Sequence, residues 1–480
     1  MALASSLSGH VINSANQPDL RGNLAPVGDE LDVANCVVTG ELPDGLCGDF
    51  VRNGPNPMFE PVSSYHMFDG DGMLHGVTLG NGRASYRNRW IRSLGLGAEI
   101  ANNQAIYPGL SEVMNFPDAS LTGNAGPVKN PANTHIIRHA GKYLALWEGG
   151  LPTEVTASLD TVGEYNFDGR LKGSMTAHPR LDKRTGEMFF FAYSLFAPFL
   201  RYYVVAADGT LVHHADLELP APVMMHDFII TERHAVFLDS PIVFNMENLG
   251  NGPMVSWRPE NGTRIGVMPR MGSATDITWY EIDPGHVQHF WNGWVEGDRL
   301  EFSGSRFDAP DFGIDSSSPL DQSTASPVAG RPTRYWVDLA KGSAGWEQFD
   351  DMGGDFNRIN DDYNGVRTRY LYMSAVGGEG RPIGDFDTIV KYDELNGSRT
   401  EWFAGRHAQV GETVFAPDPD GVAEDDGWLI NAVYDNANDS TDVVILDAHD
   451  VAYGPIASVR LPRRVPFGFH ANWFADPTPS

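Results

Sequence analysis

The sequence is 480 residues long, and 41% of its residues are hydrophobic and 11% aromatic. This composition supports a large buried core and excludes a disordered chain. There are 63 acidic residues against 34 basic ones, a formal net charge of −29, which repels phosphate backbones and excludes nucleic acid as a partner. With only two cysteines, Cys36 and Cys47, the chain holds neither a disulfide framework nor a cysteine-rich metal site.

The first 30 residues are polar and rich in turn-forming residues. We expect them to form an N-terminal arm on the surface, followed by a single domain over 31–480. The start of the sequence lacks the basic and apolar segments of a signal peptide. No apolar run reaches the length of a membrane span. These features predict a cytoplasmic protein.

From Leu31 onward, short apolar runs alternate with turns, a pattern typical of many short β-strands. Predicted strands include 143–148, 188–193, 201–205, 234–238 and 369–373. The Asp-Gly pairs of 69–72 predict a hairpin turn. Residues 93–130 are the least strand-like part, and we expect helices or loops there that cover one face. The Ser-, Pro- and Asp-rich stretch 310–330 predicts a long exposed loop.

Four histidines share one setting, an apolar and strand-like run; they are His178, His226, His289 and His470. A single histidine of this kind is more often a core residue than a ligand. Their separations along the chain are 48, 63 and 181 residues. With blades of roughly 40–70 residues, these separations correspond to one, one and three blades of a β-propeller. The sequence therefore predicts an all-β propeller in which four blades each direct one imidazole to a common axis, whereas stacked sandwiches, the alternative fold, provide no common point.

Four neutral imidazoles suit a divalent first-row metal, and the residues alone do not choose among Fe, Zn, Cu and Ni. A metal-bound imidazole usually donates its other N–H to a carboxylate or carbonyl. Glu148, Asp355 and Glu412 lie in or beside apolar runs, where an unpaired carboxylate would be costly. We interpret them as partners of the histidines, with a strand-edge or loop position as the alternative for each.

Other enzyme templates are missing from the sequence: there is no HExxH helix, GxSxG elbow or P-loop. Two rival functions remain open. A metal-free propeller that acts as a binding scaffold would need none of the four histidines. A zinc hydrolase would require a general base near the metal, and no neighbouring motif supplies one.

Several blocks of the sequence occur together in a known family; they are 50–57 (FVRNGPNP), 68–72 (FDGDG), 146–150 (LWEGG), 177–179 (AHP), 225–228 (MHDF), 289–292 (HFWN), 424–427 (EDDG) and 466–470 (PFGFH). On these blocks the chain resembles the carotenoid cleavage oxygenases, from about Asn35 to Trp473. The resemblance implies a seven-bladed propeller with a helical cap, formed in part by 93–130, over an axial metal site. It also implies one Fe(II) per chain, O₂ as co-substrate, and cleavage of a conjugated C=C bond into two carbonyl products.

Carried over to this sequence, the resemblance assigns the four histidines as iron ligands and Glu148, Asp355 and Glu412 as their hydrogen-bond partners. Asp355 departs from the family pattern, which usually has glutamate there. The shorter side chain requires that either the backbone lies closer to the histidine or a water molecule intervenes. Val295 is a second departure, at a position where family members often have an acid.

The residue beside Glu148 bears on the substrate. Members that cleave hydroxystilbenes and phenylpropenes typically carry a lysine there, whereas this chain has Trp147, which stacks on a polyene but does not hold a phenolate. The resemblance therefore implies an apocarotenoid or carotenoid-like substrate, with a stilbene or phenylpropene as the alternative. The expected substrate-contacting residues are Trp147, Phe290, Trp291 and Phe469.

We expect the partner to be a small apolar conjugated molecule, with peripheral membrane contact where it enters and no obligate protein partner. Phe196, Phe199 and Leu200 are candidates for an apolar mouth. The alternative is that these three side chains pack between a blade and the cap.

Overall fold

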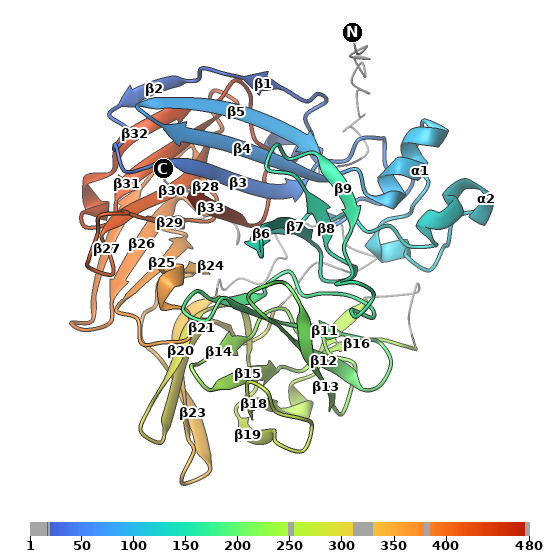
Figure 1. Ribbon diagram of the computed structural model, residues 1–480, viewed down its shortest axis with the longest axis vertical. Helices are drawn as coiled ribbons and strands as arrows, with labels where there is room; N and C mark the ends of the chain where they lie inside the picture. The colour runs from blue at the N-terminus through green and yellow to red at the C-terminus, as the bar shows by residue number, and fades with distance from the viewer. Residues whose placement is uncertain (1–16, 18–19, 248–253, 311–329, 379–384, 476–480) are drawn as a thin grey trace.

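The computed structural model describes residues 17, 20–247, 254–310, 330–378 and 385–475. In these residues the strands form seven sheets of four or more strands and one separate two-stranded sheet. The seven sheets are arranged around one axis as the blades of a propeller (Figure 1). This confirms the predicted seven-bladed, all-β architecture.

We number the blades in chain order and give the strands of each in the order of their pairing. Blade 1 is made of β33 (Ala471–Ala475), β3 (Gly48–Pro55), β4 (Gly72–Gly80), β5 (Arg83–Trp90) and β1 (Asp32–Val33). Blade 2 is made of β6 (His135–His139), β7 (Lys142–Leu146), β8 (Thr153–Val155) and β9 (Thr161–Glu164). Blade 3 is made of β10 (Arg180–Asp182), β11 (Glu187–Tyr193), β12 (Phe199–Val205) and β13 (Leu211–Glu218).

Blade 4 is made of β14 (Ile229–Ile230), β15 (His234–Asp239), β18 (Thr263–Pro269) and β19 (Thr278–Ile282). Blade 5 is made of β20 (His286–Glu296), β21 (Arg299–Phe307), β22 (Arg331–Asp338) and β23 (Ser343–Gln348). Blade 6 is made of β24 (Gly354–Arg358), β25 (Tyr370–Ala375), β26 (Thr388–Asp393) and β27 (Ser398–Phe403). Blade 7 is made of β28 (Ala408–Val410), β29 (Val414–Pro417), β30 (Gly427–Asp435), β31 (Ser440–Asp447), β32 (Pro455–Arg460) and β2 (Val37–Gly40). The separate hairpin pairs β16 (Ile242–Phe244) with β17 (Val255–Trp257).

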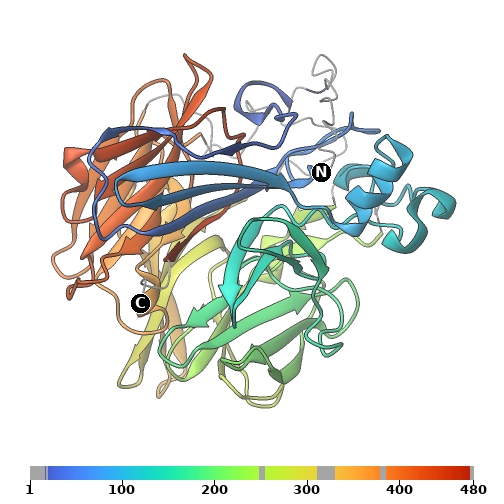
Figure 2. The same cartoon turned by 45° about the horizontal axis from the view of Figure 1, so that its top comes forward.

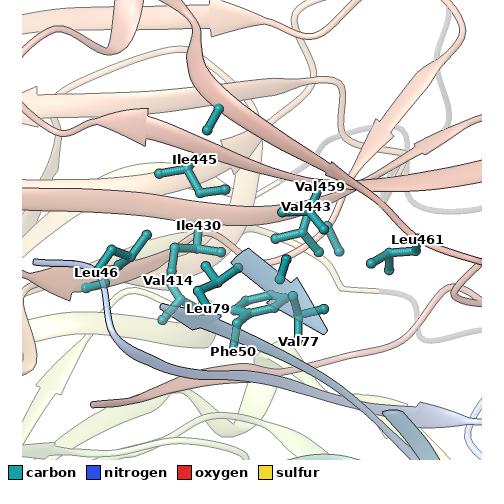
Figure 3. Packing of buried hydrophobic residues seen from close by; sticks show 14 of the residues in the cluster. Leu46, Phe50, Val77, Leu79, Val414, Ile430, Val443, Ile445, Val459 and Leu461 are labelled. Carbon is teal, nitrogen blue, oxygen red and sulfur yellow. The ribbon is translucent and has the colours of Figure 1, made fainter. Parts of the chain in front are cut away.

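The ring closes by exchange of strands between the two ends of the described chain. The late strand β33 pairs with β3 in blade 1, and the early strand β2 pairs with β32 in blade 7. Between these two blades lies a core in which Phe50, Val77 and Leu79 pack with Val414 and other buried residues of blade 7 (Figure 3). Burial of each such side chain contributes roughly 1.5–3 kcal/mol, so the closure is hydrophobic as well as hydrogen-bonded.

The burial of each strand follows its place in a blade. The outer strand β13 alternates buried and exposed residues along most of its length, because one of its faces meets solvent. The more central strand β11, with the sequence EMFFFAY, is buried from Met188 to Ala192, because neighbouring blades cover both of its faces. The continuous aromatic and apolar run that predicted this strand is thus the signature of a sheet packed on both sides.

The helices gather at one side of the ring, after β5 and before β6 (Figures 1 and 2). They are α1 (Leu94–Asn102), η4 (Leu110–Glu112), α2 (Ala119–Thr122) and η5 (Gly123–Ala125). Ser93 caps the start of α1 by accepting a hydrogen bond from Leu96 N, and Asn103 ends it in the left-handed conformation. Short 3₁₀ turns elsewhere are η3 (Gly22–Leu24), η6 (Pro259–Asn261), η7 (Asp361–Tyr363) and η8 (Val451–Tyr453). None of the described helices is long and apolar enough to cross a bilayer.

The structure contradicts one sequence prediction, and two others lie largely outside the described residues. The hairpin turn at 69–72 is wrong: the β4–β5 hairpin turns at Asn81 and Gly82, both with positive φ. Asp69 instead accepts hydrogen bonds from His66 N and Leu110 N, so it connects the segment before β4 to the helical region. The predicted loop at 310–330 and most of the predicted N-terminal arm lie outside the described residues.

Candidate metal centre

The four histidines come from four blades and meet at the axis. His178 lies just before β10 in blade 3, His226 just before β14 in blade 4, His289 within β20 in blade 5, and His470 directly before β33 in blade 1. Blades 6 and 7 lie between blade 5 and blade 1. The separations along the chain therefore correspond to one, one and three blades, as predicted from the sequence.

The ring nitrogens of these histidines converge within a small volume, all within 4.8 Å of one another. Nε2 of His226 lies 2.9 Å from Nε2 of His178 and 3.3 Å from Nε2 of His289. All four side chains are buried. Four imidazole nitrogens directed at one point form a metal-binding cluster, and this donor set fits a divalent first-row metal.

Three of the four rings have a carboxylate at the nitrogen that faces away from the cluster. Nδ1 of His226 lies 2.8 Å from Glu148 Oε2, Nδ1 of His289 lies 2.9 Å from Asp355 Oδ1, and Nδ1 of His470 lies 3.0 Å from Glu412 Oε1; the residues involved are those predicted from the sequence. A proton on Nδ1 that is donated to a carboxylate leaves the Nε2 lone pair available to a metal.

The backbone explains how the shorter Asp355 reaches its histidine. The pairing of β24 with β25 shifts register between Asp355 and Arg358, and Phe356 within this bulge has a φ of +57°. A bulge inserts an extra residue and redirects the neighbouring side chains. Because Asp355 contacts Nδ1 of His289 directly, the closer backbone compensates for the missing methylene group, and no bridging water is required.

Burial keeps two of the four imidazoles, those of His178 and His470, uncharged. It lowers the pKa of His178 and His470 well below 6.5, and the neighbouring histidines lower both further. Burial also lowers the pKa of His289, but the carboxylates of Asp355, Asp227 and Glu412, with Asp355 contributing most, more than offset this effect, so that the pKa is raised overall. Neutral imidazoles are the form that binds metal, so the environment of His178 and His470 prepares them as ligands.

The carboxylates are themselves held by residues that the sequence analysis did not identify. The partly buried Tyr193 donates a hydrogen bond of 2.7 Å to Glu148 Oε1. Glu412 Oε2 accepts a hydrogen bond of 2.7 Å from Ala471 N and lies 3.4 Å from Nη1 of Arg358. Such contacts join blades that are distant in sequence, so only the folded ring reveals them.

Trp147 and Glu148 lie just beyond the end of β7, in a turn, so the alternation of a regular strand does not apply to them. The Trp147 ring covers Gly149, where an added Cβ would lie 2.4 Å from the ring. Trp147 lines a cavity of about 70 Å³ together with residues of the helical region and with Phe68. Phe469 packs edge-on against Phe68, with ring centroids 5.4 Å apart.

The other two predicted substrate residues lie elsewhere. Phe290 and Trp291 line a separate polar cavity of about 230 Å³ that also reaches His178 and His289. Both are almost fully buried, and Trp291 Nε1 donates a hydrogen bond to the Tyr372 carbonyl. The structure thus places Trp147 on one cavity and Phe290 and Trp291 on another.

The predicted apolar mouth is only partly accessible. The Phe196 side chain is 74% exposed, whereas Leu200 is 1% exposed and belongs to the core of blades 3 and 4. The mouth interpretation of Leu200 is therefore wrong, because β12 directs this side chain inward between blades.

The chain is similar to known proteins over nearly its whole length. The model of the family described as retinal pigment epithelial membrane protein matches residues 24–475. The carotenoid 9,10(9',10')-cleavage dioxygenase 1 of Arabidopsis thaliana is 33% identical over 490 residues, which cover 95% of this chain and 90% of the relative.

Two solved structures share the fold. The lignostilbene dioxygenase of Pseudomonas brassicacearum superposes with a TM-score of 0.89 at 28% identity, covering 97% of this chain and 100% of that one. A variant of the Synechocystis apocarotenoid oxygenase superposes with a TM-score of 0.82 at 27% identity, covering 94% of this chain and 97% of that one.

Proposed function

The chain belongs to the carotenoid cleavage oxygenase family of double-bond-cleaving oxygenases, and from this premise we propose that it is an Fe(II)-dependent dioxygenase that cleaves an apocarotenoid or carotenoid-like substrate. One conjugated C=C bond and O₂ would give two carbonyl products. The observation that carries the proposal is the buried cluster of four imidazoles, three of which donate to carboxylates.

The donor set supports iron and O₂ chemistry. Four neutral imidazoles leave the full 2+ charge on a bound Fe(II), which would supply the binding and activation of O₂. Both oxygen atoms of O₂ enter the two carbonyl groups, and the double bond supplies the electrons, so no external reductant is required. Glu148, Asp355 and Glu412 orient the ligands through their hydrogen bonds to the imidazoles.

The same carboxylates argue against hydrolysis. A zinc hydrolase would need a free base beside the metal. In the described part of the chain, Glu148, Asp355 and Glu412 each accept a hydrogen bond from a histidine of the cluster, so these three acids are already committed to the ligands.

Trp147 supports a polyene substrate. The cavity that it lines has aromatic walls that include Phe59, Phe68 and Tyr107, and an indole offers a large apolar surface without positive charge. The one lysine in that wall, Lys129, is paired with Asp71 and Glu99 at 2.6 and 2.7 Å, so its charge is already balanced. A stilbene or phenylpropene is the second candidate, because the lignostilbene dioxygenase superposes so closely.

The test is product analysis with an apocarotenal, resveratrol and isoeugenol, for the parent enzyme and for Trp147→Lys. We expect the parent to cleave the apocarotenal with the higher kcat/KM, and the variant to shift this ratio toward the phenols. Tyr453→Lys, at a position that is 75% exposed and lines neither cavity, controls for the added charge. Turnover of resveratrol by the parent without turnover of any apocarotenal would reject the polyene substrate in favour of the second candidate.

We also propose that an apolar substrate enters from a membrane surface to which the protein binds peripherally. Phe196, Phe116 and Met114 are exposed large hydrophobic residues, with exposed fractions of 74, 53 and 43%. Co-sedimentation with phosphatidylcholine vesicles is expected for the parent and should weaken in a Phe196→Ser, Phe116→Ser double variant. Equal sedimentation of both proteins would contradict the proposal.

A further inference from the structure

His178 differs from the other three histidines of the metal cluster. In the residues that the structure covers, no carboxylate contacts its ring, whereas each of the others has one. Hydrogen bonds of the backbone and of the Thr176 hydroxyl hold the peptide units that lead to His178 instead. Thr176 N donates to the Phe191 carbonyl at 2.7 Å, Thr176 Oγ1 donates to the His226 carbonyl at 3.2 Å, and His178 N donates to Thr176 Oγ1 at 3.1 Å.

A fifth buried histidine acts on the same segment. His135 begins β6 in blade 2, the blade between those that carry His470 and His178. Its Nδ1 lies 2.8 Å from the carbonyl oxygen of Ala177, the carbonyl of the peptide bond to His178. Its ring centroid lies 5.8 Å from that of His178 and 5.1 Å from that of His470.

The neighbours of His135 determine its tautomer. Nη2 of Arg358 donates to Asn472 Oδ1 at 2.8 Å, which leaves the Asn472 amide nitrogen to face Nε2 of His135 at 3.1 Å. An amide nitrogen only donates, so Nε2 of His135 accepts, and its single N–H is on Nδ1. Hydrogen bonds therefore run in one direction, from Arg358 through Asn472 and His135 to the Ala177 carbonyl.

The same residues reach the ligand His470. Arg358 also donates to the Ala471 carbonyl and lies beside Glu412, whose other oxygen accepts from His470. The backbone N–H of His470 donates to the carbonyl of Thr134, the residue before His135. Since both ring nitrogens of His135 are occupied, His135 does not bind the metal itself.

We propose that His135 is a positioning residue for the metal ligand His178. By donating to the Ala177 carbonyl, it fixes the peptide that carries His178, and so performs for this ligand the orienting function that carboxylates perform for the other three. Through Asn472 and Arg358 it also couples the position of His178 to that of His470.

The experiment measures the affinity of the metal-free protein for Co²⁺, by competition with a chelator, together with the visible absorption of bound Co²⁺ and the Tm of the metal-free protein. The variants are His135→Leu, which removes the donor, and His135→Asn, whose amide keeps a donor near the position of Nδ1. The matched control is His139→Leu. His139 is on the same strand, is equally buried, and bonds to the Gly186 carbonyl at 2.9 Å, away from the cluster.

We expect His135→Leu to weaken Co²⁺ binding about 10–100-fold, the usual effect of losing an orienting partner, and to alter the Co²⁺ spectrum. His135→Asn should remain within a few-fold of the parent. His139→Leu should lower the Tm without changing the affinity or the spectrum. Three results would each overturn the inference. They are a parent-like affinity in His135→Leu, a loss of affinity in His135→Asn as large as that in His135→Leu, and a loss of that size in His139→Leu.

If His135→Leu does not fold, Asn472→Leu takes its place. This variant keeps the imidazole but removes the donor that fixes its tautomer, so Co²⁺ binding should again weaken; unchanged affinity would overturn the inference. The inference rests on the metal cluster and not on the proposed iron or substrate. A failure of the apocarotenal assay therefore leaves this result intact, and the two failures are distinguishable.

Discussion

The three carboxylates of the metal centre orient their histidines in the same way but have different surroundings. Glu148 accepts from a phenol, Glu412 from a backbone amide beside a guanidinium, and Asp355 reaches His289 from a backbone bulge. A neutral donor and a cation withdraw different amounts of charge from a carboxylate. The three imidazoles that donate to these carboxylates therefore differ in how strongly their partners polarise them.

Removal of one imidazole tests whether the histidines bind the metal. His226→Ala removes the imidazole at the centre of the cluster, within 3.3 Å of two others. We expect metal content to fall to near zero with loss of turnover, while the circular dichroism remains that of a folded β-protein. Metal analysis of protein purified without air is the measurement, and stoichiometric metal with full activity would show that His226 is not a ligand.

The second prediction compares the carboxylates. Glu412→Gln places an amide beside the buried His470, and should cost about 10–100-fold in metal affinity or activity. Asp355→Glu restores the longer side chain at a site whose carboxylate is 15% exposed, where the bulge has room to relax, and activity should stay within a few-fold of the parent. An inactive but folded Asp355→Glu enzyme would mean that the bulge is rigid and fits aspartate alone.

At the scale of elements, Asp69 connects the segment before β4 to the helical region through His66 N and Leu110 N, at 2.8 Å each. Burial raises its pKa from 3.8 to about 6, although both hydrogen bonds oppose the shift. The folded protein therefore takes up this proton at a higher pH than the unfolded chain. The stability contributed by Asp69 is full below about pH 4 and is lost as the pH rises through about 6.

This gives a pH prediction. Between pH 7.5 and pH 5, the parent should gain stability relative to Asp69→Asn, which has no proton to take up at this position. The measurement is the Tm of both proteins at both pH values, and the quantity of interest is the change in their difference, because the other acidic residues contribute to both. A difference that is independent of pH would contradict the raised pKa.

Local sequence signals predicted the strands better than their partners. The apolar runs of β11 and β12 are local features, and these strands are found where they were expected. The pairing of β2 with β32 and of β33 with β3 has no local signal, because each pair joins segments more than 400 residues apart. The same reason hid His135, whose hydrogen-bond partners lie on a distant strand and on a segment that only the ring brings near.

At the scale of the whole molecule, the metal cluster joins blades 1, 3, 4 and 5. Only the closed ring brings the four imidazoles together, so metal binds the folded protein and not the unfolded chain. By linkage, free metal at 100 times its dissociation constant would add about 2.7 kcal/mol to the free energy of unfolding.

We therefore expect the metal-free protein to have a lower Tm than the metal-bound protein. Addition of Co²⁺, or of Fe²⁺ without air, should restore the higher Tm, whereas Mg²⁺, which prefers oxygen ligands, should not. Differential scanning calorimetry of the two forms is the measurement, with His226→Ala as the control that should not respond to metal. A Tm that does not depend on metal would imply that the imidazoles meet without binding it.

The late position of His470 has a consequence for biosynthesis. Synthesis runs from the N-terminus, so the ribosome produces six blades and three of the four histidines before His470 emerges. Until then the nascent chain carries an incomplete set of ligands and lacks β33, the strand that completes blade 1. The four-histidine centre that we propose to activate O₂ is therefore completed only after the rest of the propeller has been synthesised.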